Sequence, residues 1–324
     1  MAGRRVRAAK RVVPAAAALL LAAVALPGGT PVDLQPNHLT LTARVGLAPT
    51  STDSSASSCN PVSQNVSLTP STSDSGPDVQ AIIKRGRLIA GIDTNSYEWG
   101  FRDPSTGQLE GFDITLVHAL AQAILGNAND VEFLSIPTAD RIPALQSGEV
   151  DVVVRTMTIS CAREQQVSFS SPYFDAGQEV LVPKSSTITG YNSTLKGKRV
   201  CAATGSTAAD FLQTNDFGST VVPVENQLNC LVLMQLGLID ATITDNALGA
   251  GQVAQDPTTH LVGGLMDSET YGVAMKLGST DLVRRVNAVL DDFRDSGAWM
   301  DDYNQWLRNS LGPVSGPPSV TYSG

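Results

Sequence analysis

The sequence has few of the residues on which enzyme active sites usually depend. Its three histidines, His38, His118 and His260, are scattered, and none stands in H-E-x-x-H spacing. No G-x-S-x-G, G-x-G-x-x-G or G-x-x-x-x-G-K-[ST] motif occurs, so the common signatures of serine hydrolases, dinucleotide-binding enzymes and P-loop proteins are missing. We therefore expect a protein that is not an enzyme and needs no metal or cofactor.

Excess positive charge is also missing. The chain of 324 residues has a formal net charge of -9, whereas a nucleic-acid-binding surface needs a basic footprint. We therefore expect no nucleic-acid partner. The length favours about two domains of ordinary size.

No apolar run is long enough to be a typical membrane span. "VVPAAAALLLAAVAL" has 15 residues, fewer than the roughly 20 that a spanning helix needs. It follows the basic stretch "MAGRRVRAAKR" and contains Ala23-Val24-Ala25, which is typical of a signal peptide over residues 1–25. The sequence thus predicts export, with an uncleaved anchor as the alternative. No cysteine directly follows the run, so membrane attachment through a lipid stays open.

The four cysteines show no C-x-x-C spacing. In an oxidising compartment an even number suggests disulfides, and four cysteines allow three connectivities. Cys201 lies in a predicted strand and Cys230 opens a helix of the same βαβ unit, so we pair these two. Cys59 with Cys161 then follows. Free buried thiols are the alternative.

The organisation of the chain changes near residue 79. Residues 26–79 are rich in Ser, Thr and Pro, which is typical of a flexible tether. Beyond them the pattern predicts a short helix that ends at Gly86, a strand over 88–92, and a helix that Asp113 caps and Gly126 ends. The last residues, 312–324, read as a loose tail.

Two later segments repeat one pattern. "RIPALQSGEVDVVV" and "CLVLMQLGLIDATIT" each predict a helix, then Gln-x-Gly-x-x-Asp, then a buried strand. This repeat favours an α/β fold with two similar lobes. A chance recurrence of common turn chemistry is the alternative.

Polar residues gather where the predicted strands end, which is where open α/β sheets bind ligands. The turn at 204–207 adds backbone N–H groups at a helix N-terminus, which suit an anion. Arginines that seek a carboxylate, together with an aspartate that seeks an ammonium group, indicate a zwitterionic ligand. These strand-end residues are Arg155, Thr156, Thr158, Arg163 and Asp245.

Five segments carry a resemblance to a known family. In order they are "GFDITLVHALA", "LQSGEVDVVV", "MTISCAREQQVSFSSPYF", "LKGKRVCAATGSTA" and "IDATITDNAL". The set, which covers about residues 87–308, resembles the polar amino-acid binding proteins of bacterial ABC importers (solute-binding protein family 3). The resemblance implies a type II periplasmic-binding-protein fold with a two-strand hinge. Lobe 1 would be residues 80–182 plus 267–311, and lobe 2 residues 183–266.

The resemblance also implies roles for single residues. Arg163 would bind the ligand α-carboxylate, assisted by Thr158 and by the turn at Gly205, Ser206 and Thr207. Asp245 would take the α-ammonium group.

Three further residues would face the ligand side chain. An aromatic residue of the first strand–helix loop packs on the ligand in this family, and of Tyr97, Trp99 and Phe101 we favour Trp99. Arg141 stands where the glutamate/aspartate branch places a side-chain-binding arginine. Arg155 replaces a small residue common in the family and would add a second cation.

We therefore expect an exported, monomeric receptor that closes on glutamate or aspartate and delivers it to the permease of an ABC importer. Asparagine and glutamine stay open, because an amide and a carboxylate have the same shape. One alternative is an amino-acid sensor that signals through a membrane protein. Another is a dehydratase on the same fold, for which Glu98 and Glu225 are the conceivable acids.

Overall fold

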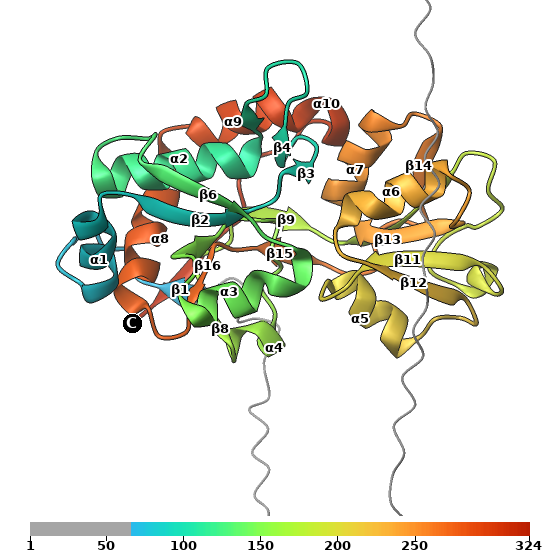
Figure 1. Ribbon diagram of the computed structural model, residues 1–324, viewed down its shortest axis with the longest axis horizontal. Helices are drawn as coiled ribbons and strands as arrows, with labels where there is room; N and C mark the ends of the chain where they lie inside the picture. Colours follow the sequence, from blue (N-terminus) through green and yellow to red (C-terminus); the bar gives the residue numbers. More distant parts are fainter. Residues whose placement is uncertain (1–65) are drawn as a thin grey trace, which may run out of the picture. The chain divides into compact units, whose positions relative to one another are not determined.

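Two α/β lobes make up the described part of the protein (Figure 1). The computed structural model describes residues 66–324, which belong to one compact unit. The predicted signal peptide, Cys59 and the tether up to residue 65 lie outside the described residues. No helix within residues 66–324 has the length and apolar character of a membrane span.

Lobe 1 contains a five-stranded sheet in the order β6-β2-β7-β16-β8. β2 is parallel to β6 and β7, whereas β16 runs antiparallel to β7 and β8. α2, α8 and α9 pack on one face and α3 on the other, and α1 contacts α2 and α8. The strand bounds are β2 Leu88–Ile92, β6 Val131–Ser135, β7 Val152–Val153, β8 Val167–Phe169 and β16 Ala274–Lys276. The helix bounds are α1 Pro77–Arg85, α2 Phe112–Leu125, α3 Arg141–Ser147, α4 Cys161–Glu164, α8 Thr280–Asp295, α9 Ala298–Trp306 and α10 Arg308–Leu311.

Lobe 2 has a sheet of the same design. Its order is β12-β11-β13-β10-β14, with β11 parallel to both neighbours and β10 antiparallel to β13 and β14. α5 covers one face, and α6 and α7 cover the other. The bounds are β10 Gln178–Pro183, β11 Arg199–Ala203, α5 Thr207–Thr214, β12 Thr220–Val224, α6 Gln227–Gln235, β13 Ala241–Asp245, α7 Asn246–Gln255 and β14 Thr259–Val262.

The repeated sequence pattern has a common structural cause. Gly148 is the C-cap of α3 and Gly237 directly follows the C-cap of α6, and both have positive φ, 76° and 67°. Asp151 then accepts a hydrogen bond from the backbone N–H of Ile89, and Asp240 accepts one from that of Arg199, each at 2.8 Å. Each aspartate therefore ties the start of its own strand to the start of the neighbouring parallel strand.

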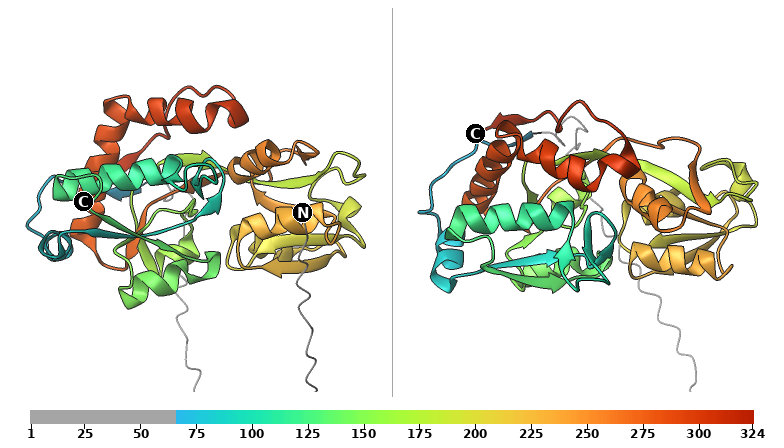
Figure 2. Two further views of the ribbon diagram at one scale, coloured as in Figure 1. Left: turned by 45° about the horizontal axis from the view of Figure 1, so that its top comes forward. Right: turned by 90° about the horizontal axis from the view of Figure 1, so that it is seen from above.

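Two antiparallel strands connect the lobes, as Figure 2 shows from two further directions. They are β9 Phe174–Ala176 and β15 Glu269–Tyr271, in which Ala176 pairs with Glu269. The chain enters the lobe 2 sheet at Gln178, where β10 begins. The predicted boundary at residue 182 is therefore late, because β10 pairs with β13 and β14 and not with any strand of lobe 1.

The C-terminal residues are not a loose tail. β17 Thr321–Ser323 pairs in parallel with β1 Val66–Leu68. The Asn287 amide of α8 donates to the Leu68 carbonyl at 2.7 Å. The last part of the predicted tether is ordered as well, since it contains β1 and the start of α1. The prediction of a loose tail over 312–324 and that of a tether over 66–79 failed, because this pairing joins segments that are remote in sequence and have little periodicity.

Asp113 does not cap α2. The residue before the helix is Gly111, with φ 126°, and the Asp113 side chain is buried inside lobe 1. It accepts hydrogen bonds from the Tyr173 hydroxyl at 2.8 Å and from the Thr156 N–H at 3.1 Å. Burial raises the pKa of Asp113 to about 7.

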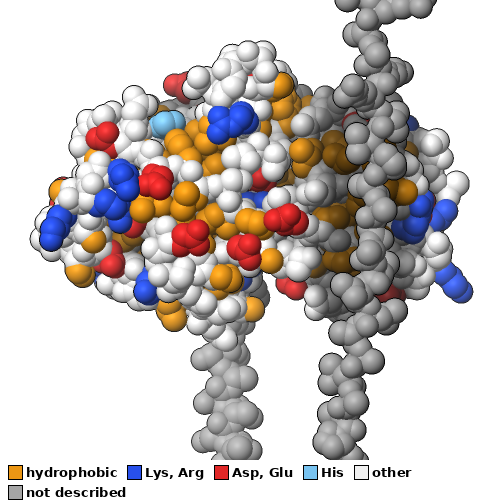
Figure 3. Space-filling model, viewed as in Figure 1, with side chains coloured by type: hydrophobic (Ala, Val, Ile, Leu, Met, Phe, Trp, Pro, Cys, Tyr) orange, Lys and Arg blue, Asp and Glu red, His pale blue; other side chains and the backbone are white. Residues whose placement is uncertain are grey.

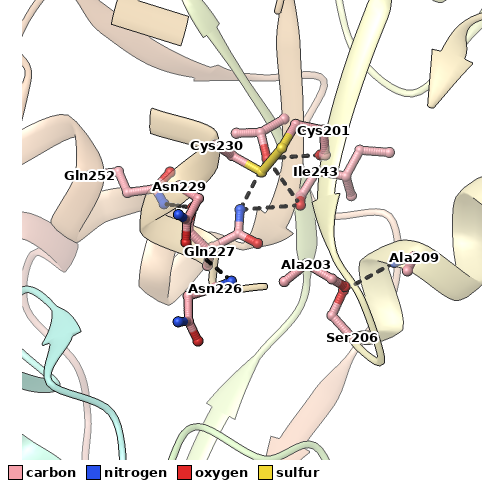
Figure 4. Close-up of a disulfide and its surroundings, with 11 residues drawn as sticks. Cys201, Ala203, Ser206, Ala209, Asn226, Gln227, Asn229, Cys230, Ile243 and Gln252 are labelled. Atoms are coloured by element: carbon pink, nitrogen blue, oxygen red, sulfur yellow. Dashed lines mark hydrogen bonds between the residues drawn. A yellow bond between two sulfur atoms is a disulfide. The ribbon is translucent and has the colours of Figure 1, made fainter. Parts of the chain in front are cut away.

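The predicted disulfide between Cys201 and Cys230 is present (Figure 4). It joins β11, an inner strand of the lobe 2 sheet, to α6, in a cluster with Leu181, Met234 and Ile239. Cys161 pairs with no cysteine among residues 66–324. Its predicted partner Cys59 lies outside the described residues, so that pairing stays a prediction.

Candidate ligand-binding site

A polar pocket lies between the lobes, beside the two connecting strands. Residues from both lobes line it, and Gln178, where the chain enters lobe 2, is one of them. Nine of the ten predicted site residues come together here; eight of them line the pocket, and Gly205 presents its carbonyl beside it. The polar lining residues are Asp93, Ser96, Thr138, Arg141, Arg155, Thr156, Thr158, Arg163, Gln178, Ser206, Thr207, Gln227, Thr244 and Asp245.

Three buried arginines give the lobe 1 wall its charge. Arg141, Arg155 and Arg163 are 4%, 4% and 7% exposed. The surface in Figure 3 is different, because acidic and basic side chains are interspersed there. Buried cations need partners, so their hydrogen bonds indicate which of them remain available to a ligand.

Arg163 and Arg141 form no ion pair with a carboxylate of residues 66–324. Arg163 donates to the Thr158 carbonyl at 2.8 Å, and Arg141 donates to the Thr138 carbonyl at 2.9 Å. Both also donate across the pocket to the carbonyl of Gly205, each at 3.2 Å. Burial, and then the charges of Arg163 and Arg155, lower the pKa of Arg141. This end of the pocket therefore favours an anion.

Arg155 is already neutralised. Its Nη2 lies 3.0 Å from Oδ2 of Asp93, and both side chains are buried. Nη2 also donates to Asn226 Oδ1 of lobe 2 at 2.8 Å, and Nη1 donates to Thr138 Oγ1 at 3.1 Å. Only Nε has no partner in the described residues. Arg155 thus adds the expected second cation to the pocket wall, but Asp93, a strand-end aspartate that was not predicted, compensates its charge.

Two buried carboxylates lie near these arginines. Asp245 ends β13 and lines the pocket, Glu269 begins β15, and neither has an ion-pair partner among residues 66–324. The side-chain amide of Gln178 donates to both, and it also donates to Thr207 Oγ1 at 2.9 Å. Burial, and then the nearby Glu269 charge, raise the pKa of Asp245 well above its usual value. This pair of carboxylates favours a cation.

Hydrogen bonds to the backbone and to a carboxylate hold two of the hydroxyls in place. Ser206 is the N-cap of α5; its Oγ accepts from the Ala209 N–H at 3.1 Å and donates to the Ala203 carbonyl at 2.6 Å. Thr158 Oγ1 donates to Glu269 at 2.7 Å. Thr156 has φ 42°, which is strained for a β-branched residue, and strain of this kind gathers at functional sites.

Trp99 is not brought to the pocket. It is completely buried, its Nε1 donates to the Ala247 carbonyl at 3.2 Å, and it packs edge-on against Phe174 and Tyr271. Ser96 of the same loop lines the pocket instead. The loop sequence offered three aromatic residues but gave no sign of which way each would point.

Glu98 and Glu225, the conceivable acids of a dehydratase, do not line the pocket. Glu98 accepts a hydrogen bond from the Ser310 hydroxyl at 2.6 Å. The sequence analysis missed Asp93, Gln178 and Glu269. The rule about strand ends would have found Asp93, which directly follows β2, whereas no local pattern marks the other two.

The family model for bacterial extracellular solute-binding proteins, family 3, matches residues 88–309, more than half of the chain. The chain belongs to this family. The family and the relatives below are binding proteins and not enzymes.

Curated relatives and a solved structure agree with this assignment. The ABC transporter glutamine-binding protein GlnH of Bacillus subtilis is 34% identical over 72% of this chain and 86% of its own length. The glutamine-binding protein of Geobacillus stearothermophilus is 38% identical over 60% of this chain and 74% of its own. An ancestral arginine-binding protein bound to glutamine is 36% identical, with a TM-score of 0.65 over 71% of this chain and 99% of the other.

Proposed function

We propose that this protein is an exported receptor that binds one polar amino acid between its lobes and delivers it to an ABC importer. The observation that carries the proposal is that buried charges of both signs meet at the pocket without ion-pair partners. Among residues 66–324, Arg163 and Arg141 form no ion pair with a carboxylate, and Asp245 and Glu269 form none with a cation. An amino acid zwitterion would satisfy both sets of charges at once.

The α-carboxylate would bind to Arg163, beside the start of α5. An arginine fork suits a carboxylate, and the backbone N–H groups at a helix N-terminus add to the attraction. To reach it, the carboxylate would replace the Gly205 carbonyl as the acceptor for Arg163. The α-ammonium group would bind beside Asp245, where Gln178 Oε1 is buried without a hydrogen-bond partner among residues 66–324.

The side chain would extend toward Arg141, Arg155 and Asp93. An amide suits these three best, because its oxygen accepts from the guanidinium groups while its NH₂ donates to the Asp93 carboxylate. A side-chain carboxylate would meet the same arginines but would be repelled by Asp93. We therefore propose glutamine as the preferred ligand, with glutamate second. The names of the two curated relatives support this choice.

Transport and sensing use the same pocket. Membership of the family and the match to an ABC transporter protein favour transport. The proposed partner is therefore the permease of an importer, and the proposed location is outside the cytoplasmic membrane.

Calorimetric titration of the purified protein with glutamine, glutamate, aspartate, asparagine and arginine tests the proposal. We expect micromolar binding of glutamine, which corresponds to roughly -8 kcal/mol. Arg163→Ala should abolish it, while Arg87→Ala, a change at an exposed ion pair outside the pocket, should not. If none of the amino acids binds, the proposed function is wrong.

A further inference from the structure

The two buried carboxylates that accept hydrogen bonds from Gln178 belong to different parts of the fold. Asp245 belongs to lobe 2, at the end of β13, as the family resemblance led us to expect. Glu269 is the first residue of β15, one of the two strands that connect the lobes. Its partner across the pair is Ala176, two residues before Gln178. Glu269 and Gln178 therefore occupy neighbouring points on the two connections.

The hydrogen bonds of Glu269 reach both lobes. Oε2 accepts from the Thr158 hydroxyl of lobe 1 at 2.7 Å, and from the Gln178 amide, where the chain enters lobe 2, at 3.2 Å. Glu269 is 4% exposed. A buried carboxylate held this way keeps its position only while both connections keep theirs.

Hydrogen-bond donors are in short supply at this point. The Gln178 NH₂ has two N–H groups, yet Asp245, Glu269 and the Thr207 hydroxyl oxygen all lie within its reach. Gln178 Oε1 has no donor at all in the described residues. An ammonium group brings three donors and one positive charge, so it would supply what this cluster of acceptors lacks.

We propose that Glu269 is a positioning residue of the amine subsite, which we define as Asp245, Gln178 and Glu269, and that it couples recognition of the ligand's positive charge to the connection between the lobes. Glu269 holds Gln178 and Thr158 in place and contributes the second negative charge. This inference rests on the proposed function. The inference restricts the ligand to molecules that carry a free protonated amine. N-acylated or deaminated analogues should therefore bind poorly or not at all.

The subsite should also make binding dependent on pH. Without the ammonium group, two buried carboxylates repel each other, so burial and then Glu269 raise the pKa of Asp245. The positive charge of the bound ligand lowers the pKa of Asp245 again. A protonated Asp245 must therefore release its proton when the ligand binds. Affinity should therefore fall as the pH drops below the raised pKa and level off above it. The other titratable groups of residues 66–324 that face the subsite are Arg141 from α3, Arg163 from α4, Asp210 from α5, and Asp267 and Tyr271 beside Glu269.

The test is calorimetric titration of wild type, Glu269→Gln and Glu179→Gln with glutamine and with glutaramate, which is glutamine without its α-amino group, between pH 5 and pH 8. Glu179→Gln is the matched control, because Glu179 directly follows Gln178 on β10 and its side chain points to the opposite face of the sheet. At pH 8 we expect Glu269→Gln to lose roughly 10- to 100-fold in glutamine affinity. The control should stay within about threefold of wild type.

Two further outcomes separate a charge effect from mere loss of structure. In Glu269→Gln the fall of affinity should begin at a lower pH, because the negative charge of Glu269 no longer raises the pKa of Asp245. The ratio of glutamine to glutaramate affinity should also shrink. An unchanged pH profile and ratio in this variant would overturn the inference, even if affinity dropped. Failure of the wild type to bind any amino acid would instead overturn the proposed function.

Discussion

The Asp93–Arg155 ion pair should decide between an amide and a carboxylate on the ligand. Asp93 directly follows β2, and its Oδ2 lies 3.0 Å from Arg155 Nη2. Replacing Asp93 with asparagine keeps the size and one acceptor oxygen but removes the negative charge. Arg155 then becomes a free cation beside the ligand side chain. We expect the preference of Asp93→Asn to move from glutamine toward glutamate.

The size of this shift follows from electrostatics. Two unit charges about 6 Å apart interact by roughly 3 kcal/mol at an effective dielectric constant of about 20. Removing the repulsion between Asp93 and a side-chain carboxylate should thus raise the glutamate-to-glutamine affinity ratio by about 10- to 100-fold. The change also has a stability cost, because removing one partner of a buried ion pair costs about 3–5 kcal/mol. The retained hydrogen bonds from the Thr94 and Asn95 N–H groups should keep the cost near the lower value.

The assay is titration of both ligands into wild type, Asp93→Asn and Asp151→Asn, with thermal unfolding of each protein. Asp151 is the control, since it pairs with Arg85 at the other end of the lobe 1 sheet and does not line the pocket. Its variant should lose some stability and keep the wild-type ratio. A folded Asp93→Asn protein with an unchanged ratio would refute the assignment of the side-chain subsite.

Three further predictions concern stability. Replacing Cys201 and Cys230 with alanine opens a loop with a sequence separation of 29 residues. The free energy of unfolding, measured by urea titration, should therefore drop by about 3–4 kcal/mol. A drop below about 1 kcal/mol would mean that the disulfide contributes little to the stability of lobe 2. Removing residues 312–324 should lower the melting temperature while leaving ligand affinity nearly unchanged, because β17 and the Tyr322–Asp291 hydrogen bond stabilise lobe 1 at a place away from the pocket. An unchanged melting temperature would contradict this stabilising role. Burial raises the pKa of Asp302 to about 8, so the folded state holds more protons than the unfolded state between about pH 4 and pH 8, and stability falls as the pH rises through that range. Asp302→Asn should therefore raise the melting temperature more at pH 8 than at pH 5. An equal change at both pH values would refute the raised pKa of Asp302.

The sequence predicted most of what depends on local patterns. Helix ends at Gly86, Gly126 and Gly148 are where glycine was expected to stop them, since each has positive φ. The pairing of Cys201 with Cys230 followed from the adjacency of a strand and its covering helix, and the structure confirms it. Parallel strands end on one edge of a sheet, so the polar residues behind them were expected together without any knowledge of the sheet order.

Other features depend on contacts that no local pattern records. The pairing of β1 with β17 joins residues more than 250 positions apart. Trp99 faces the core because Phe174 and Tyr271, which come from the two connecting strands, form its surroundings. Asp113 resembles a helix cap in sequence, yet its carboxylate accepts hydrogen bonds from the Thr156 N–H and the Tyr173 hydroxyl.

Arg155 shows how the charge of a site can be misjudged from one residue. A strand of valines that ends in arginine predicted a polar pocket at the strand end, and Arg155 lines such a pocket. The charge that a ligand meets, however, is the sum over all neighbours, and Asp93 comes from a different strand 62 residues earlier in the chain. The same reasoning applies at the other end, where Glu269 joins Asp245 only because the chain crosses between the lobes twice. Specificity in this fold is therefore set by pairs of residues that the sheet order and the connections bring together, so a single arginine is weak evidence for an acidic ligand.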